Sequence, residues 1–455
     1  MSTVEPAASA GPAGPAAGPG AAPATRRSAG PTAATGADPG QLQAIVDTCV
    51  HCGFCLPTCP TYELWGQEMD SPRGRIQLMN LGLSGEPLTD STVTHIDRCL
   101  GCMACVTSCP SGVRYDTLVT AKRAEVEATY RRSWPQRALR TAIFSVFPYP
   151  RRLRLLRGPL RLGQLLRLDR LAGGRLLARL TPGFSTMVSL TPRLASRPRL
   201  PARVPARGRR RAVVGMLTGC VQGEFFPQVN SATARVLAAE GCEVVIPRGQ
   251  GCCGALSLHA GRRQEAVRFA RRTADTFNRA GVEAVVVNAA GCGSAMKEYA
   301  ELGVAAPPVR DLSELLVQLG TVARRHPLPV TVAYQDACHL RHAQGIHQQP
   351  RQLLAAVPQL TLRELADAEL CCGSAGIYNL LQPQAGRELG DRKAAAVAQT
   401  GAQLLVSANP GCAMQIVAGL RRAGGPLPVA HLAEVLDAAI SGVGASAAMA
   451  RFSRS

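Results

Sequence analysis

The sequence predicts a multidomain protein of mixed α+β and α/β class. Eight cysteines form two similar clusters between residues 41 and 130, and an Arg-rich segment follows over residues 131–211. From residue 212 onward, short β-branched runs alternate with helical segments, and this order of elements occurs twice. We therefore expect a helical cysteine-rich domain, an Arg-rich helical linker and a duplicated α/β half.

Residues 1–40 are nearly all Ala, Gly, Pro, Ser and Thr. Because such a segment buries too little apolar surface to offset its ordering entropy, we expect a disordered tail. It lacks the pattern of a secretory signal, and no run of about 18 apolar residues predicts a membrane span. The 17 cysteines lie largely in short clusters, which is typical of metal ligation in a reducing cytoplasm.

Residues 41–130 contain the motif C-x2-C-x2-C-x3-C-P twice, as "CVHCGFCLPTCP" and "CLGCMACVTSCP". Three thiolates at this spacing bind three corners of an iron-sulfur cubane. The fourth, before Pro60 or Pro110, points away and binds the other cluster of a two-cluster ferredoxin. The alternative, a pair of structural zinc sites, needs two CxxC pairs instead of an uninterrupted triple. His51, between two ligands, is expected to face solvent. The predicted [4Fe-4S] ligands are Cys49, Cys52, Cys55 and Cys109 for the first cluster, and Cys99, Cys102, Cys105 and Cys59 for the second.

Residues 131–211 hold 21 Arg and one acid, Asp169, and thus carry the whole net charge of +20. Leu153, Leu156 and Leu160 recur at helical spacing, which predicts an amphipathic connector interrupted by Pro and Gly. It could be a solvated linker, or it could dock on anionic lipid or an acidic partner at the inner face of the cell membrane. Nucleic acid is not expected, because aromatic residues are scarce and no binding module surrounds the segment.

The duplicated half divides into domains at residues 212–325 and 326–445. Four cysteines of each copy match at offsets of 118 to 120 residues. Each follows a predicted strand, and loops after parallel strands gather at the carboxyl edge of a sheet. We therefore expect two sites, one from Cys220, Cys252, Cys253 and Cys292, and one from Cys338, Cys371, Cys372 and Cys412.

The stretch "GQGCCG", Gly249 to Gly254, also satisfies the G-x-G-x-x-G spacing of a dinucleotide-binding turn. Its duplicate "AELCCG" keeps the thiols and only the last glycine. A dinucleotide turn should open its helix at once, whereas "ALSLHAG" is expected to intervene before Arg262. The thiols therefore define the site, and they could hold a further cluster, form a reversible disulfide, or simply be buried.

Other polar residues near the second set are expected to have supporting roles. His339, His342 and His347 are predicted to be polar fillers, with a ligand or proton-handling role for His339 as the alternative. Asp336 is predicted to be a loop residue.

Together, "CVHCGFCLPTCPTY", "DSPRGRIQLM", "CLGCMACVTSCPSGVRYDTLV", "GCCGALSLHAG" and "CCGSAGIYNLLQP" resemble the iron-sulfur subunit of bacterial glycolate oxidase, over about residues 41–440. The resemblance implies two cysteine-rich (CCG) domains. It also implies a partner flavin subunit, with FAD, that oxidises glycolate to glyoxylate, while this chain relays electrons towards quinone or another membrane acceptor. In the similar CCG subunit of heterodisulfide reductase, motifs ending in CxxC hold non-cubane clusters. Here Ala289 and Asn409 replace that extra cysteine, so each site offers four thiols.

The sequence has no convincing flavin or nicotinamide fingerprint and no acid-base constellation, so we predict no catalytic residue and an electron-transfer subunit. The alternatives are a subunit of a related lactate or glycerol-3-phosphate dehydrogenase, an autonomous CCG reductase, and an iron-sulfur regulator that binds nucleic acid. The substrate is decided on the flavin subunit.

Overall fold

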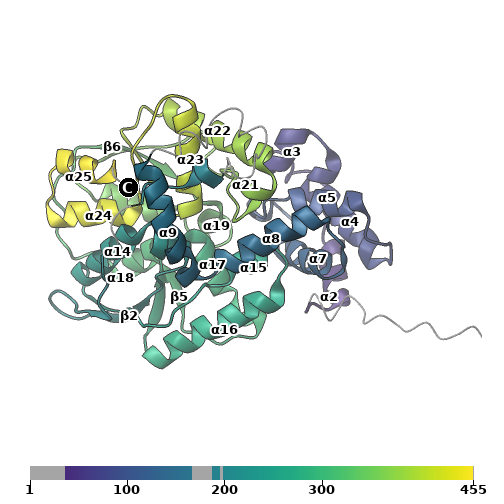
Figure 1. Ribbon diagram of the computed structural model, residues 1–455, viewed down its shortest axis with the longest axis horizontal. Coiled ribbons are helices and arrows are strands. Elements are labelled where there is room, and N and C mark those ends of the chain that lie inside the picture. The colour runs from purple at the N-terminus through teal and green to yellow at the C-terminus, as the bar shows by residue number, and fades with distance from the viewer. Residues whose placement is uncertain (1–35, 167–186, 195–197, 454–455) are drawn as a thin grey trace, which may run out of the picture.

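The computed structural model describes residues 36–166, 187–194 and 198–453. A helical N-terminal part lies beside a larger part that contains two sheets (Figure 1). This arrangement confirms a helical region followed by two α/β units. Nearly all of the predicted disordered tail lies outside the described residues. Among the helices that the structure describes, none is long and apolar enough to cross a membrane.

Short capped helices build the N-terminal part. Asp38, Ser71 and Thr89 each accept a backbone N–H with their side chains and so begin a helix. Ile76, Ile96 and Val119 are among the buried side chains between these helices. The elements are α2 (Pro39–Asp47), α3 (Pro60–Trp65), the 3-10 helix η1 (Glu68–Asp70), α4 (Pro72–Leu83), α5 (Asp90–Arg98), α6 (Ala104–Thr107) and α7 (Tyr115–Thr129).

The basic segment begins with two helices, α8 (Trp134–Val146) and α9 (Pro150–Leu165). The expected leucine stripe is only partly right. Leu153 is buried, but Leu156 is 44% exposed, because α9 continues through Pro159 and touches the protein along a narrow face. Residues 167–186, which include Asp169, lie outside the described part of the chain.

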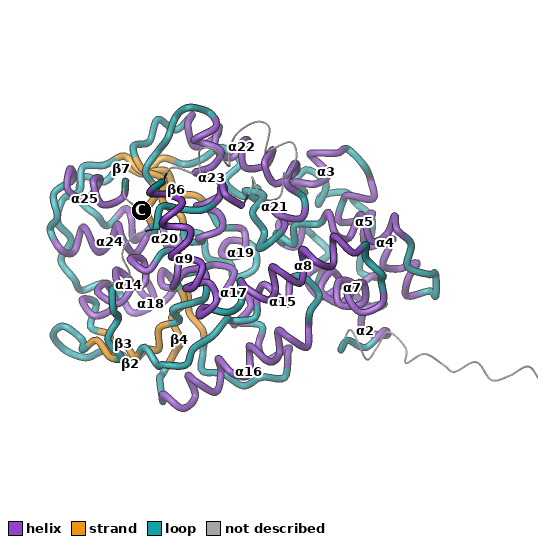
Figure 2. Tube along the Cα trace, in the orientation of Figure 1, coloured by secondary structure: helices purple, strands orange, loops and turns teal. Residues whose placement is uncertain are grey.

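Two sheets form the second part of the protein (Figure 2), and the same strand order occurs in both. The first has the order β1-β3-β2-β4-β5, and all its pairings are parallel except that of β1 with β3. The second is parallel, with the order β7-β6-β8-β9. The predicted duplication is thus visible as the same topology in both copies. The strands are β1 (Arg203–Val204), β2 (Ala212–Met216), β3 (Cys242–Val245), β4 (Ala284–Val287), β5 (Val309–Asp311), β6 (Thr331–Gln335), β7 (Thr361–Arg363), β8 (Leu404–Ser407) and β9 (Val429–Ala430).

Helices cover both sheets, and one of them corrects an expectation. α15 begins directly after Gly254, so the CCG turn does open a helix at once, although it is only five residues long. The first copy contains α13 (Val221–Phe225), α14 (Pro227–Ala239), α15 (Ala255–His259), α16 (Arg263–Ala280), α17 (Ala290–Lys297), the 3-10 helix η2 (Tyr299–Leu302) and α18 (Leu312–Leu319). The second copy contains α19 (Cys338–Arg341), α20 (Gln348–Ala355), α21 (Tyr378–Leu381), α22 (Pro383–Gln399), α23 (Pro410–Arg422) and α24 (Leu432–Ser441), and α25 (Ala445–Phe452) follows them.

The two copies share one hydrophobic core, which includes strands of both sheets together with α14 and α24. Polar contacts cross the same boundary. Arg235 of α14 donates two hydrogen bonds to Asp437 of α24, and His431 Nε2 donates to the buried carbonyl of Asn288 at 2.8 Å. The copies therefore form one body, which holds the two cysteine sites in a defined relation.

Candidate metal centres

Four thiols of the N-terminal part line one small cavity. They are Cys59, the N-cap of α3; Cys99, the C-cap of α5; and Cys102 and Cys105, at and within α6. Gly101 and Met103 have φ of +64°, and this left-handed backbone turns the chain around the cavity. The thiols are the four that the sequence assigns to the second cluster.

Hydrogen-bond donors and a buried cation surround this cavity. Gly101 N–H donates to Cys99 Sγ at 3.3 Å, and the hydroxyl of Tyr115 donates to the same sulfur at 3.6 Å. Arg75, only 1% exposed, lies 3.9 Å from Cys59 Sγ. Burial alone would raise the pKa of Cys99, but Arg75, Arg123 and these donors bring that pKa below its ordinary value. These contacts favour the thiolate of Cys99, whereas burial raises the pKa of Cys102 and Cys105.

Buried ion pairs hold Arg75 in place. Its guanidinium donates to Asp70 Oδ1 at 3.3 Å and to Thr61 Oγ1 at 3.1 Å. Asp70 is fully buried and also bonds His95 at 2.8 Å and Arg98 at 2.8 Å. Cluster ligation by four cysteines adds net negative charge, which a fixed buried cation offsets. The residues present thus fit an anionic iron-sulfur cluster.

The other predicted set is more open to solvent. Cys49, Cys55 and Cys109 pack at the edge of the N-terminal core, and Cys52 is exposed. Burial is the main cause that raises the pKa of Cys55, and the neighbouring Cys49 and Cys59 add to it. Cys55 is thus close to a thiol of each set. As expected, His51 is exposed, and its φ is +54°.

In the first CCG copy, the four cysteines meet at the carboxyl ends of β2, β3 and β4. Cys220 and Cys252 are 3.9 Å apart, measured between Sγ atoms. Cys253 accepts hydrogen bonds from Cys252 and Cys292, and these lower its pKa well below the ordinary value. Tyr299 donates to the Cys253 carbonyl at 2.7 Å and fixes the turn.

The second CCG copy repeats this geometry and adds charge. Cys338 Sγ and Cys371 Sγ are 4.0 Å apart, and hydrogen bonds from Cys371 and Cys412 lower the pKa of Cys372. The buried Lys393 lies near Cys372 and lowers its pKa further. At the end of the row, Asn409 Nδ2 donates to Cys412 Sγ at 3.3 Å.

The last glycine of each CCG motif has a steric role. Gly254 has φ of +89° and Gly373 has φ of +80°, and a Cβ at either would lie within 3.0 Å of a carbonyl oxygen, in α16 for Gly254 and in α22 for Gly373. Gly249 also has positive φ, but nothing lies within 4 Å of its Cβ position. The duplicated glycine thus lets the thiol turn approach a helix, and its partial match to a dinucleotide motif follows from that packing.

The cavity of the N-terminal part adjoins the second CCG site. Cys102, Cys338 and Cys371 belong to one buried cluster together with Leu100 and Tyr378. Burial is the largest cause that raises the pKa of Cys102, and the charge of Cys338 is the next. The sequence gives no sign of this contact, because it depends on how the domains pack.

The two CCG sites also lie on facing elements. α17, which carries Cys292, packs against α19, which begins at Cys338. The Ala290 N–H donates to the Ala408 carbonyl at 3.1 Å across the two copies. The rings of His259 of α15 and His339 of α19 lie with their centroids 4.8 Å apart and their planes tilted by 44°.

The remaining polar residues of the second copy are placed as follows. His339 Nδ1 lies 3.7 Å from Cys338 Sγ, whereas His342 bonds Thr107 of the N-terminal part at 2.7 Å. His347 caps α20, and its carbonyl accepts from Arg351. Asp336 is a buried partner of Arg341 and Arg351. Of these four residues, only His339 contacts a site thiol.

Within the described residues, no group of three or more His, Cys, Asp or Glu side chains converges closely enough to hold a single metal ion. In each CCG copy the thiols instead contact one another in a row.

Comparison with known proteins agrees with this architecture. Family models match for a 4Fe-4S dicluster domain at residues 45–113 and for a cysteine-rich domain at residues 214–297 and 332–417. A third model, the linker region of the glycolate oxidase iron-sulfur subunit, matches residues 135–191. The basic segment, which the sequence alone left as a connector, is thus itself a family feature.

Similar curated proteins cover nearly the whole chain. A probable glycolate oxidase iron-sulfur subunit of Bacillus subtilis is 36% identical over 85% of this chain and 92% of its own length. The glycolate oxidase iron-sulfur subunit of Escherichia coli is 36% identical over 88% of this chain and 95% of its own length. A lactate utilization protein A of Exiguobacterium is 31% identical over only 49% of this chain. The two-cluster domain, the linker and both CCG domains therefore place this chain in the family of glycolate oxidase iron-sulfur subunits.

Proposed function

We propose that this chain accepts electrons from a flavin subunit that oxidises glycolate to glyoxylate and passes them towards a membrane quinone. Membership of the family supports an electron-transfer subunit of an oxidoreductase complex. The proposed route through this chain rests on the contact between the N-terminal cavity and the second CCG site, because that contact joins two candidate redox sites without intervening solvent.

The proposed ligand sets are those of crossed ligation. Cys49, Cys52, Cys55 and Cys109 hold one [4Fe-4S] cluster, and Cys99, Cys102, Cys105 and Cys59 hold the other. Each cluster supplies a one-electron carrier, so the two electrons of a flavin hydroquinone leave one at a time. The shared cavity and the thiolate-stabilising donors support the second set.

The residues around the second set tune it. Arg75, Gly101 N–H and the Tyr115 hydroxyl all direct positive charge or a donor at its sulfurs. Such contacts stabilise the more negative, reduced state and raise the potential. The first set lies at the exposed edge, which suits entry of electrons from a partner, and the second set is buried towards the CCG domains.

The second CCG site is the next electron acceptor in this route. Hydrogen bonds from neighbouring thiols lower the pKa of Cys338 and Cys372, while those of Cys371 and Cys412 are raised. The two lowered thiols and the nearby Lys393 support thiolate chemistry there, whether the four sulfurs hold a further cluster or exchange electrons as thiol and disulfide. In the first copy, Thr273 donates to the Cys252 carbonyl from the helix position that matches Lys393. The route therefore runs through the copy with more positive charge.

Attachment to an anionic membrane fits the surface of α9. Leu155 is 77% exposed and Leu165 is 72% exposed, and the exposed Arg161 lies between them. A helix with arginines and bare leucines lies favourably at a lipid interface. We propose that this surface holds the complex at the inner face of the cell membrane.

The test is purification of the native complex and anaerobic addition of glycolate, lactate or glycerol 3-phosphate, with cluster reduction followed by visible absorbance. Rapid bleaching by glycolate alone is expected. Bleaching only by another donor would reassign the substrate, and glycolate oxidation by the isolated chain would overturn the electron-transfer assignment.

A further inference from the structure

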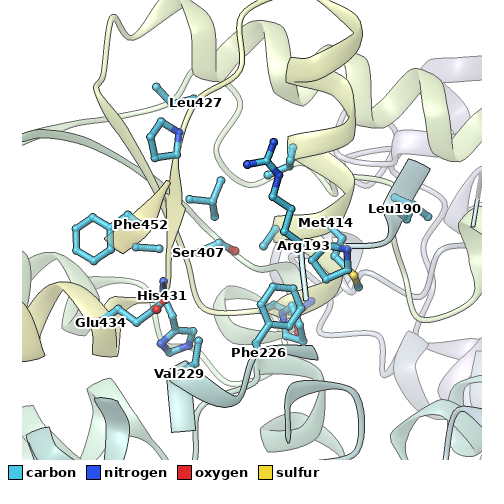
Figure 3. A pocket seen from close by; sticks show the side chains of 18 of the residues that line it. Leu190, Arg193, Phe226, Val229, Ser407, Met414, Leu427, His431, Glu434 and Phe452 are labelled. Atoms are coloured by element: carbon cyan, nitrogen blue, oxygen red, sulfur yellow. Dashed lines mark hydrogen bonds between the residues drawn. The ribbon is translucent and has the colours of Figure 1, made fainter. Parts of the chain in front are cut away.

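A cavity of about 280 Å³ lies beside the second CCG site and has no role in the electron route so far (Figure 3). Its volume is close to the lower end of small-molecule sites, roughly 300–1,000 Å³. The wall combines the chain around residues 189–193, α13, the start of α23, and residues near β9 and α25. We call it the linker pocket.

The linker pocket is mainly apolar. Phe226 and Phe452 lie on different sides of it, with Met414 and Leu427 on further walls (Figure 3). The polar groups are few. They include Arg193, Arg421 and Glu434. The backbone N–H of His431 donates to the carboxylate of Glu434 at 2.9 Å. An apolar body with a few directed polar groups suits a flat, uncharged ring that carries polar oxygens.

One polar atom in the wall is unpartnered. Gln222 is only 4% exposed, yet its Oε1 has no hydrogen-bond partner among the described residues. A buried acceptor left without a donor costs roughly 1–3 kcal/mol, so a ligand that bonds this amide recovers that cost. By rotation of the amide, the same side chain could donate to a quinone carbonyl or accept from a hydroquinone hydroxyl.

The linker pocket lies one side chain away from the proposed redox site. Asn409 and Pro410 line it, and the side-chain amide of Asn409 donates to Cys412 Sγ at 3.3 Å. A ring bound there is separated from the row of thiols by one side chain.

The wall is also tied to the proposed membrane surface. Gln164 of α9 donates to the Pro192 carbonyl at 2.8 Å and accepts from Leu194 N–H at 3.2 Å, so α9 holds the segment that closes the pocket. α9 packs on α13, where Arg154 pairs with Glu224 at 2.9 Å, and α13 supplies Gln222. α9, which carries the exposed leucines, therefore packs against two segments of the pocket wall.

We propose that the linker pocket is the binding site for a membrane-dissolved quinone, which takes the electrons that reach Cys412. This inference rests on the proposed function and names the site and the chemical class of the acceptor. Electrons and protons balance in the overall reaction. Oxidation of glycolate to glyoxylate releases two electrons and two protons, and one quinone takes up two electrons and two protons to leave as hydroquinone. Electrons arrive one at a time, and the protons are drawn from water.

The test is direct binding of decyl-ubiquinone to the full-length chain in lipid nanodiscs, measured by calorimetry with no electron donor present. Val417 lines the linker pocket, and Val417→Trp is expected to weaken binding at least tenfold by filling it. Gln222→Leu is expected to weaken binding about two- to tenfold through the lost hydrogen bond. Val322→Trp is the matched control, because Val322 is 62% exposed and does not line the pocket, and it should bind as the unaltered chain does.

Two further measurements separate the possible failures. A photoreactive azidoquinone on the unaltered chain should label peptides of α23 or residues 189–193, which does not depend on any variant folding. Glycolate-driven cluster reduction in the whole complex should be equal in all three variants. Unchanged quinone binding by Val417→Trp, or labelling elsewhere, would overturn the pocket, whereas clusters that glycolate fails to reduce would contradict only the proposed function.

Discussion

Asp70 holds Arg75 beside the second cluster set, and the replacement of Asp70 by asparagine is the most informative change. Asp70 is fully buried, and its carboxylate bonds Arg75 at 3.3 Å, His95 at 2.8 Å and Arg98 at 2.8 Å. Arg75 in turn lies 3.9 Å from Cys59 Sγ. Asp70→Asn keeps the shape of the side chain but removes the buried carboxylate that pairs with Arg75, His95 and Arg98.

The size of the effect follows from burial. Arg75 is 1% exposed, whereas Arg98 is 28% exposed and can regain water. Removal of one partner from a buried ion pair costs roughly 3–5 kcal/mol, and we expect the free energy of unfolding of the N-terminal domain to fall by about that amount. Glu68 belongs to the same 3-10 helix but pairs with Arg73 at the surface, so Glu68→Gln should cost less than about 1 kcal/mol.

Urea titration followed by the visible absorbance of the clusters reports this domain separately from the CCG domains. With a slope of about 1–3 kcal/mol per molar urea, the midpoint of Asp70→Asn should fall by at least about 1 M. The midpoint of Glu68→Gln should stay close to that of the unaltered chain. Equal urea midpoints for the two variants would refute the view that Asp70 stabilises the buried Arg75 beside the cluster.

Three other predictions follow from single contacts. Gly261 has φ of +82°, and a Cβ there would lie 2.1 Å from the Arg123 carbonyl oxygen. Gly261→Ala should therefore separate the N-terminal domain from the first CCG copy and speed limited proteolysis between them. Gly281→Ala is the control and should not change the proteolysis rate, because Gly281 also has positive φ but nothing lies near its Cβ position. Tyr115→Phe removes a donor to Cys99 Sγ and should lower the midpoint potential of one cluster by about 20–60 mV, the equivalent of roughly 0.5–1.4 kcal/mol, whereas Tyr130→Phe at the surface should leave both potentials unchanged. Burial raises the pKa of Glu434 from 4.5 to about 7 although the His431 N–H lowers it, with Asp437 and Arg235 as the other charges that affect it. Because the folded protein then holds a proton that the unfolded chain releases, the free energy of unfolding should fall as pH rises from 4.5 to 7, and Glu434→Gln should remove that part of the pH dependence; identical pH profiles would contradict it.

Local patterns predicted much of this architecture. The repeated cysteine spacing correctly indicated a two-cluster domain, and the alternation of strands and helices correctly indicated two parallel sheets of one topology. The repeat also explains Cys242, the one cysteine outside the four proposed sets. Cys242 pairs with Ala212 in the first sheet, as Thr361 pairs with Thr331 in the second, so it occupies a core strand position and has no duplicated thiol.

Long-range packing was not predictable in the same way. The contact of Cys102 with Cys338, the salt bridges of Asp70 and the orphan amide of Gln222 all depend on surfaces that meet far apart in the sequence. Short-range expectations also failed where packing decided the outcome. α15 starts directly after the CCG glycine because that glycine lies against α16, and the leucines of α9 are mostly bare because the helix touches the protein along one narrow face.

The most direct test of the central claim is rapid-freeze electron paramagnetic resonance of the anaerobic native complex after mixing with glycolate. The claim predicts that signals of reduced [4Fe-4S] clusters appear before quinone is reduced. It also predicts that Cys102→Ser, which alters the set next to Cys338, slows quinone reduction while the first cluster still becomes reduced. Quinone reduction with both clusters oxidised throughout, or at an unchanged rate in Cys102→Ser, would contradict the account.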